Sequence, residues 1–148
     1  MKRVLIAGGT GFIGSFLAKK LKEKGYEVII LTRQIQNIID FETFSWDISK
    51  GEIQTEAFNN IDFIINLAGE NISDGRWTKG KKKTIEESRV KSTGILFEAV
   101  KNLDKKPEAY ISASAIGFYG TFNSEKIFAE TDKSGQDFLA TICSEWEK

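Results

Sequence analysis

The chain has 148 residues, 21 basic and 21 acidic side chains, one cysteine and no histidine. A chain of this length buries enough apolar surface to fold without a disulfide or a metal, so we expect one domain over residues 1–148. Zero net charge argues against nucleic-acid binding, and the lack of histidine excludes a Cys/His zinc site or a serine–histidine triad within these residues.

The first residues contain no stretch typical of an export signal or a membrane span. Lys2 and Arg3 precede only four apolar residues, 4–7, before glycines interrupt the run. That run is too short for a signal-peptide core and far below the about 20 residues of a membrane-spanning helix. We therefore expect a soluble protein, and its single cysteine fits a cytoplasmic location.

Short apolar runs alternate with segments of helical spacing along the chain. The runs are rich in β-branched residues and predict five strands, over residues 3–7, 27–31, 43–46, 62–67 and 108–112. A first helix, ending at Gly25, is indicated by an apolar stripe of four residues, Ile13, Phe16, Leu17 and Leu21. A second, longer helix is expected to begin near Lys81, and a third helical pattern covers residues 137–148.

This alternation predicts an α/β fold. We expect a doubly wound parallel sheet, with helices on both faces and the strand order 3-2-1-4-5. The four lysines within residues 79–83 indicate a solvated start of the second helix, because Glu86 and Glu87 follow directly; an anion-binding patch is the alternative.

A glycine motif, Gly8-x-x-Gly11-x-x-Gly14, joins the first strand to the first helix. Gly8 allows the tight turn, Gly11 allows the backbone to approach a pyrophosphate, and Gly14 allows the helix to pack against the sheet. The helix N-terminus then offers free N–H groups to the phosphates. Strand, glycine loop and helix together predict a Rossmann-like dinucleotide-binding fold.

The residues after the second strand indicate which dinucleotide is bound. NAD sites place an acidic residue there, whereas this chain has Thr32 and Arg33. Thr32 does not repel a 2′-phosphate and Arg33 can pair with it, so NADP(H) is favoured over NAD(H). The alternative is that Arg33 is a solvated loop residue, and Gly69, after the fourth strand, could likewise serve only a turn.

The predicted cofactor contacts extend to the ends of the third and fourth strands. Asp47 and Ile48 are expected near the adenine, and the small residues after Asn66 allow close approach of the cofactor. The full set of predicted cofactor-binding residues is Gly8, Thr10, Gly11, Phe12, Ile13, Gly14, Thr32, Arg33, Asp47, Ile48, Leu67, Ala68 and Gly69.

At this point the sequence resembles the extended short-chain dehydrogenase/reductase superfamily, of the NAD-dependent epimerase/dehydratase type. The resemblance is carried by the glycine spacing, Asp47-Ile48, the run from Asn66 to Gly69, and the segment from Ser112 to Gly120. Three further features are typical of the branch named epimerase family protein: Arg76-Trp77-Thr78, Ser88-Arg89 and the closing segment from Phe138 to Glu147. Members of this branch are about twice as long, so the chain is similar to their N-terminal half.

The resemblance implies a catalytic Ser, Tyr and Lys, with the last two in Tyr-x-x-x-Lys spacing. Ser114 fits the serine position if the loop before Tyr119 carries one extra residue; otherwise Ala115 takes that position. Leu139 and Cys143 stand where the Tyr and Lys are expected, and neither can transfer the proton. Cys143 is expected to be a small buried helix residue.

Three interpretations of this departure remain open. Tyr119 could replace the missing acid/base, with Ser114 nearby and a cation from residues 77–89 as helper; the alternative for Tyr119 is packing beside the nicotinamide. The domain could instead bind NADP(H) without turnover, as a sensor or regulator. The acid/base could also come from the absent half.

We expect an NADP(H)-dependent oxidoreductase or epimerase-like protein, with Ser114 and Tyr119 as candidate catalytic residues and no metal. The substrate is not identified by the sequence, and a nucleotide-sugar-like molecule is the candidate class. A homodimer is the candidate assembly. Arg76-Trp77 and Ser88-Arg89 could either line a pocket for an anionic substrate or clamp the loop after the fourth strand.

Overall fold

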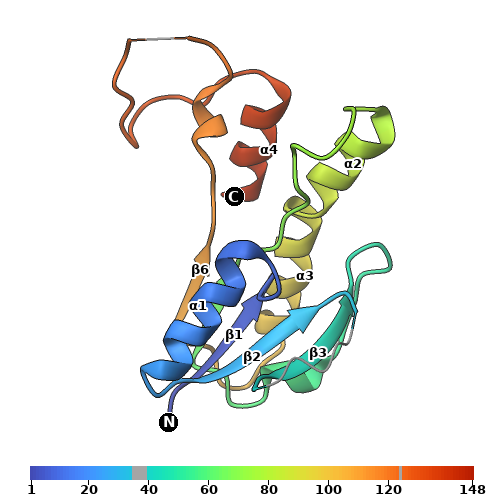
Figure 1. The fold of residues 1–148 in the computed structure, drawn as a ribbon, viewed down its shortest axis with the longest axis vertical. Helices are drawn as coiled ribbons and strands as arrows, with labels where there is room; N and C mark the ends of the chain where they lie inside the picture. The colour runs from blue at the N-terminus through green and yellow to red at the C-terminus, as the bar shows by residue number, and fades with distance from the viewer. Residues whose placement is uncertain (35–39, 124) are drawn as a thin grey trace. The chain divides into compact units, whose positions relative to one another are not determined.

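The computed structural model describes residues 1–34, 40–123 and 125–148 (Figure 1). Two compact units divide the chain, Met1–Ser112 and Ala113–Lys148. The single domain expected over residues 1–148 stays a prediction. Among the described residues, no helix is both long and apolar enough to cross a membrane.

The first unit is built around one sheet. Its strands are β1 (Arg3–Ala7), β2 (Glu27–Thr32), β3 (Glu42–Asp47), β4 (Glu52–Ile53), β5 (Phe63–Asn66) and β6 (Ala109–Ser112). Within the described residues these six strands have the order β4-β3-β2-β1-β5-β6. β1 pairs in parallel with both β2 and β5, β3 with β2, and β6 with β5, whereas β4 is antiparallel to β3.

The sequence predicts five of these strands and does not predict β4. This strand has two residues, and only Trp46 and Asp47 of β3 pair with it. Two residues carry no periodic pattern, so pairing across the turn, rather than local propensity, makes them a strand.

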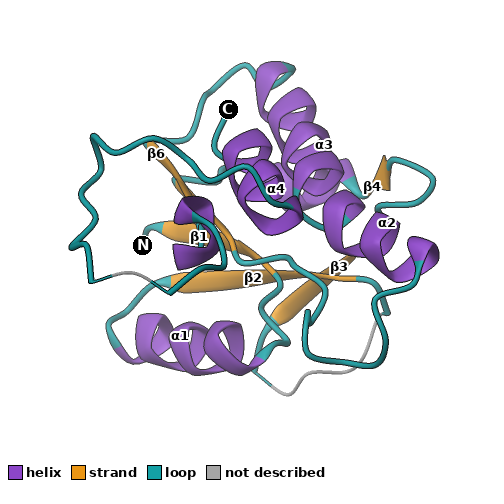
Figure 2. Cartoon of the chain, turned by 90° about the horizontal axis from the view of Figure 1, so that it is seen from above, coloured by secondary structure: helices purple, strands orange, loops and turns teal. Residues whose placement is uncertain are grey.

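Helices cover both faces of the sheet. The helices of this unit are α1 (Phe12–Glu23), α2 (Lys79–Glu87) and α3 (Val90–Lys101), with a short 3₁₀ helix η1 (Thr55–Phe58). Figure 2 shows α1 against one face and α3 against the other. Because side chains alternate along a strand, Val4 and Ile6 of β1 pack in the cluster with Ala18 of α1, whereas Leu5 packs in the cluster with Leu96 of α3.

The predicted apolar stripe of α1 is only partly correct. Ile13 and Phe16 are each 66% exposed, and Gly14 and Ala18 are the buried residues of this helix. α1 approaches the sheet closely through these two small residues, four positions apart on one helix face. Ile13 and Phe16 are thereby turned toward solvent, whereas Leu21 of the predicted stripe packs against the cluster that contains Ala18.

The predicted long second helix is two helices, α2 and α3, separated at Ser88 and Arg89. The carbonyl of Ile85 accepts hydrogen bonds from Ser88 Oγ (2.9 Å) and Arg89 Nη1 (3.1 Å). The N–H of Arg89, which would bond this carbonyl in a continuous helix, bonds Glu86 instead (3.0 Å). Side chains thus replace the backbone partner and break the helix.

The second unit contains a 3₁₀ helix, η2 (Ile116–Tyr119), and α4 (Phe138–Trp146). Asp137 caps α4, with its carboxylate accepting a hydrogen bond from the N–H of Ala140 (3.0 Å). Hydrogen bonding to this charged form lowers the pKa of Asp137. Cys143 is buried on α4, as predicted.

Candidate functional site

The glycine loop follows β1 and leads into α1. Gly8 has φ +80°, and a Cβ there would lie 2.8 Å from the carbonyl carbon of Leu67. A Cβ on Gly14 would lie 2.7 Å from Gly9 Cα, so α1 can sit at this distance only with glycine there. Gly11 caps α1 without a side-chain hydrogen bond. The first N–H groups of α1 are therefore not covered by a capping side chain, which suits an anion.

A cavity of about 600 Å³, the glycine-loop cavity, opens beside this loop. It lies where β1, β2, β3 and β5 end, the edge at which parallel α/β sheets bind ligands. Its lining residues are Gly8, Thr10, Gly11, Leu31, Thr32, Arg33, Gln34, Trp46, Ile48, Leu67, Ala68, Gly69, Glu70 and Ser88. Phe12, Ile13, Gly14 and Asp47 of the predicted set are not among these lining residues.

The glycine-loop cavity fits an extended dinucleotide. Its volume is within the range of small-molecule sites, and the loop leaves no room for a side chain at Gly8 or Gly14. A backbone surface without side chains next to an uncapped helix N-terminus can accept a pyrophosphate closely. Gly8, Thr10 and Gly11 are the lining residues that would hold the phosphates.

Thr32 and Arg33 stand at the end of β2. The Thr32 hydroxyl donates to the carbonyl of Gln34 (2.9 Å), which closes the turn after the strand. Arg33 is 72% exposed at its side chain and lines both the glycine-loop cavity and an adjoining cavity of about 350 Å³. Its position at the cavity rim allows it to reach a bound anion.

Asp47 has its carboxylate engaged within its own turn. Its Oδ1 accepts hydrogen bonds from the N–H of Ser49 (2.9 Å), the Ser49 hydroxyl (2.5 Å) and the N–H of Lys50 (3.2 Å). The hydrogen bond from the Ser49 side chain is the largest cause of the lowered pKa of Asp47. The carboxylate thus holds the turn between β3 and β4.

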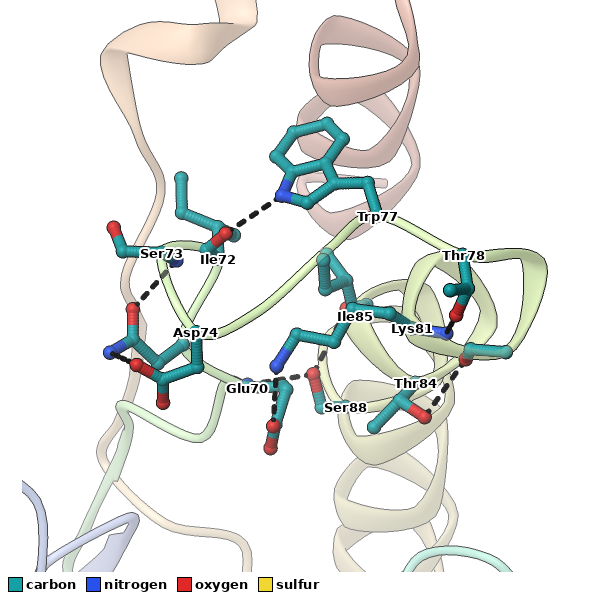
Figure 3. A network of polar contacts seen from close by, with 12 residues as sticks. Glu70, Ile72, Ser73, Asp74, Trp77, Thr78, Lys81, Thr84, Ile85 and Ser88 are labelled. Atoms are coloured by element: carbon teal, nitrogen blue, oxygen red, sulfur yellow. Dashed lines mark hydrogen bonds and ion pairs between the residues drawn. The ribbon is translucent and has the colours of Figure 1, made fainter.

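Glu70, in the loop after β5, lines the cavity and is not among the residues predicted from the sequence. Its Oε1 is 2.8 Å from Lys81 Nζ, and its Oε2 is 3.7 Å from Arg33 Nη1 (the Lys81 pair is drawn in Figure 3). The hydrogen bond from Lys81, and then the charges of Lys81, Arg33 and Arg89, lower the pKa of Glu70 against the effect of burial. Glu70 is therefore charged at neutral pH.

Lys81 is the exception to the predicted solvated lysine run, whose other three members are exposed. Its side chain is 15% exposed and is directed from α2 toward the loop after β5 (Figure 3). By contrast Lys83, on the same helix, is 74% exposed and pairs only loosely with Glu87 (3.8 Å). A run of lysines gives no sequence signal for which member meets a carboxylate eleven positions earlier.

Ser88 and Arg89 clamp the loop after β5, one of the two alternatives left open by the sequence, and Ser88 also lines the glycine-loop cavity. Ser88 Oγ accepts a hydrogen bond from the N–H of Glu70 (2.8 Å), and Arg89 Nη2 donates to the Glu70 carbonyl (3.1 Å). A Cβ on Gly69 would lie 3.2 Å from the Arg89 guanidinium carbon. Both backbone groups of Glu70 are thereby fixed, which positions its carboxylate.

The loop between Glu70 and α2 is closed by Trp77. The indole Nε1 of Trp77 donates to the carbonyl of Ile72 (2.8 Å; Figure 3). The Asn71 amide donates to Asp74 (2.9 Å). The Thr78 hydroxyl then caps α2 by accepting a hydrogen bond from the N–H of Lys81 (3.2 Å). These contacts fix where α2 begins, and with it the position of Lys81.

Ser114 and Tyr119, the candidate catalytic residues, lie in the second unit. Ser114 Oγ donates a hydrogen bond to the carboxylate of Glu147. The Tyr119 hydroxyl donates to the carbonyl of Ala129 (3.1 Å), and its ring stacks on Phe128 with centroids 4.6 Å apart. Their predicted role toward a cofactor in the first unit stays a prediction.

Tyr110 of β6 lies close to Asn66 and Thr93. Hydrogen bonds with Asn66 and Thr93 oppose, but do not outweigh, the effect of burial, which raises the pKa of Tyr110. Asn66 is fully buried and donates to the Thr93 hydroxyl (3.0 Å). A tyrosine with a raised pKa keeps its proton at neutral pH, so Tyr110 is suited to holding Asn66 rather than to acting as a base.

Comparison with known proteins identifies the family. The model of the NAD dependent epimerase/dehydratase family matches residues 4–141. The chain belongs to this family. An epimerase family protein of Staphylococcus aureus is 39% identical over an alignment of 153 residues. The alignment covers 100% of this chain and 49% of the relative. The chain thus spans about half the length of the curated relatives it matches.

Two solved structures support the same assignment. A human epimerase family protein, solved with NADPH, has a TM-score of 0.81 and 29% identity over 98% of this chain and 47% of its own. A nucleoside-diphosphate sugar epimerase from Corynebacterium glutamicum has a TM-score of 0.80 and 34% identity over 99% of this chain and 29% of its own. The family and its α/β fold, with the mostly parallel sheet, are therefore shown, and the epimerase branch named by the resemblance is confirmed.

Proposed function

We propose that the glycine-loop cavity binds NADP(H) in preference to NAD(H). The observation that carries this proposal is Arg33 at the cavity rim, at the end of β2, next to Thr32 instead of an acidic residue. An arginine can bind a 2′-phosphate through two charge-assisted hydrogen bonds, whereas a carboxylate at this position would repel it. The similar human protein solved with NADPH supports the choice.

Titration with NADPH and NADH tests this preference. Trp46 lines the cavity, so its fluorescence reports binding. We expect NADPH to bind more tightly than NADH. Arg33→Ala should lower the ratio of NADPH to NADH affinity about tenfold, the typical loss of a charge-assisted contact. Lys83→Ala is the control, because it removes one positive charge from an exposed site outside the cavity lining. Equal affinities for the two dinucleotides in the unaltered protein would refute the preference.

We further propose that the protein is an NADP(H)-dependent oxidoreductase or epimerase that acts on a nucleotide-sugar-like substrate. The family match and the similar nucleoside-diphosphate sugar epimerase support this class. Ser114 and Tyr119 are the candidate groups for orienting the substrate oxygen and moving its proton. In bound NADP(H), the nicotinamide would supply the hydride exchange.

A non-catalytic NADP(H)-binding sensor or regulator is the second candidate. It is favoured by Leu139 and Cys143, which stand where the resemblance expects a Tyr-x-x-x-Lys pair, and by the hydrogen bond that occupies the Tyr119 hydroxyl. Turnover by the whole protein over a panel of nucleotide sugars separates the two candidates. For the enzyme, Tyr119→Phe and Ser114→Ala should each lower turnover by about a hundredfold, with Tyr26→Phe as control. Cofactor binding without turnover would favour the regulator.

A further inference from the structure

Glu70 is a carboxylate held between two cations at the cavity rim. Its Oε1 is within hydrogen-bond distance of Lys81 Nζ (2.8 Å), whereas its Oε2 is 3.7 Å from Arg33 Nη1, too long for a hydrogen bond. Lys81 and Glu70 are mostly withdrawn from solvent, with side chains 15% and 23% exposed, and Arg33 is 72% exposed. The tight partner of Glu70 is therefore Lys81, and Arg33 is only loosely held.

The backbone around Glu70 leaves its carboxylate little freedom to move. Ser88 and Arg89 bind its N–H and carbonyl, and Lys81 is fixed by its place in the first turn of α2. Lys81 and Arg33 consequently share one carboxylate, with Lys81 close to Oε1 and Arg33 farther from Oε2. Partly buried ion pairs are screened less than exposed ones, which favours the Lys81 pair.

Without Lys81, the same carboxylate would act on Arg33 and on the cavity. Its full charge would draw Arg33 from 3.7 Å into hydrogen-bond distance and would repel an anion bound at the cavity rim. Both effects would oppose the binding of a 2′-phosphate, and neither requires any change in the glycine loop.

We propose that Lys81 is a positioning residue for cofactor selection: by binding Glu70, it leaves Arg33 available to the 2′-phosphate of NADP(H). This inference rests on the proposed binding of NADP(H) through Arg33. Lys81 acts through Glu70 and does not line the cavity itself. The selectivity for the phosphorylated dinucleotide thus depends on a lysine of α2, eleven positions after Glu70, as well as on the arginine after β2.

The test measures dissociation constants of NADPH and NADH for the full chain and its variants, with adenosine 2′,5′-bisphosphate and AMP as probes that lack the nicotinamide. Lys81→Met should lower the NADPH-to-NADH affinity ratio about fivefold, the size expected for losing one partly screened charge interaction. The ratio of bisphosphate to AMP affinity should fall in parallel. Lys83→Met removes the same charge from an exposed position of α2 and should leave both ratios unchanged.

Glu70→Gln supplies the second arm. The amide keeps the shape of the side chain but carries no charge, so the NADPH-to-NADH affinity ratio should be unchanged or higher. In the double variant, Lys81→Met should no longer lower this ratio. A role of Lys81 in holding the loop alone would weaken NADPH and NADH equally, since both need the loop. If Lys81→Met leaves the NADPH-to-NADH affinity ratio unchanged, with or without an equal loss for the two dinucleotides, the inference is overturned. A lower ratio in Glu70→Gln would overturn it as well.

The outcome for the unaltered protein separates this inference from the proposed function. If NADPH and NADH bind equally, and Arg33→Ala changes neither, the proposed preference fails and the inference fails with it. If the preference exists and depends on Arg33, but Lys81→Met leaves it intact, only the role of Lys81 fails.

Discussion

Replacing Gly14 by alanine tests how the glycine loop and α1 fit together. A Cβ at this position would lie 2.7 Å from Gly9 Cα and 3.0 Å from the Gly8 carbonyl carbon. Both are backbone atoms, so no flexible side chain can move aside, and α1 must shift away from the loop. Such overpacking costs about 1–3 kcal/mol.

Gly94→Ala is the matched control for this substitution. Gly94 lies within α3, and a Cβ there meets nothing within 4 Å. Alanine in a helix interior is favoured over glycine by about 1 kcal/mol, so Gly94→Ala should raise the free energy of unfolding by about that amount. Gly14→Ala gains at most the same propensity and also meets the backbone contacts, so its unfolding free energy should be lower than that of Gly94→Ala by about 1–3 kcal/mol.

Urea denaturation followed by tryptophan fluorescence measures the free energy of unfolding of both variants, and NADPH titration measures their binding. We expect Gly14→Ala to weaken NADPH binding, because the displaced loop no longer presents its N–H groups to the pyrophosphate. Gly94→Ala should bind as the unaltered protein does. If Gly14→Ala proved as stable as Gly94→Ala and bound NADPH equally well, the close approach of α1 to the loop would be wrong.

Two further predictions concern stability. Arg89→Ala removes the donor to the Glu70 and Ile85 carbonyls, so it should lower the free energy of unfolding by about 1–3 kcal/mol, measured by urea denaturation; an unchanged value would show that the clamp contributes nothing. The N–H of Arg3, and then Lys105, hold the pKa of Asp62 below its ordinary value of 3.8. Its contribution is present above that value and is lost as the pH falls through the lowered pKa, so Asp62→Asn should be less stable at neutral pH and lose less on acidification. Parallel unfolding free energies of the two proteins from pH 7 to about pH 3 would contradict this assignment.

The sequence by itself determined the parallel strands and the glycine loop. Short apolar runs such as the one in β1 are typical of buried strands, and the spacing of Gly8, Gly11 and Gly14 depends only on neighbouring residues. Both patterns are local, so they can be recognised from neighbouring residues alone. The same holds for Arg33, whose place follows from the end of β2.

Elements that depend on distant partners could not be derived in this way. Periodicity predicts that the larger apolar residues of α1 face the sheet, because it identifies a face but does not show that Gly14 and Ala18 are the residues that allow close packing. The break between α2 and α3 results from side-chain hydrogen bonds to the Ile85 carbonyl, which compete with the helix ladder only in the folded state.

Which charged side chains pair at the cavity rim was likewise decided by the tertiary structure. Composition establishes that the chain has equal numbers of basic and acidic side chains, yet it does not indicate which of them meet. Only the folded chain brings Lys81 within 2.8 Å of Glu70 and leaves Arg33 at 3.7 Å. Coulomb interactions depend on distance and burial, and both are properties of the tertiary structure.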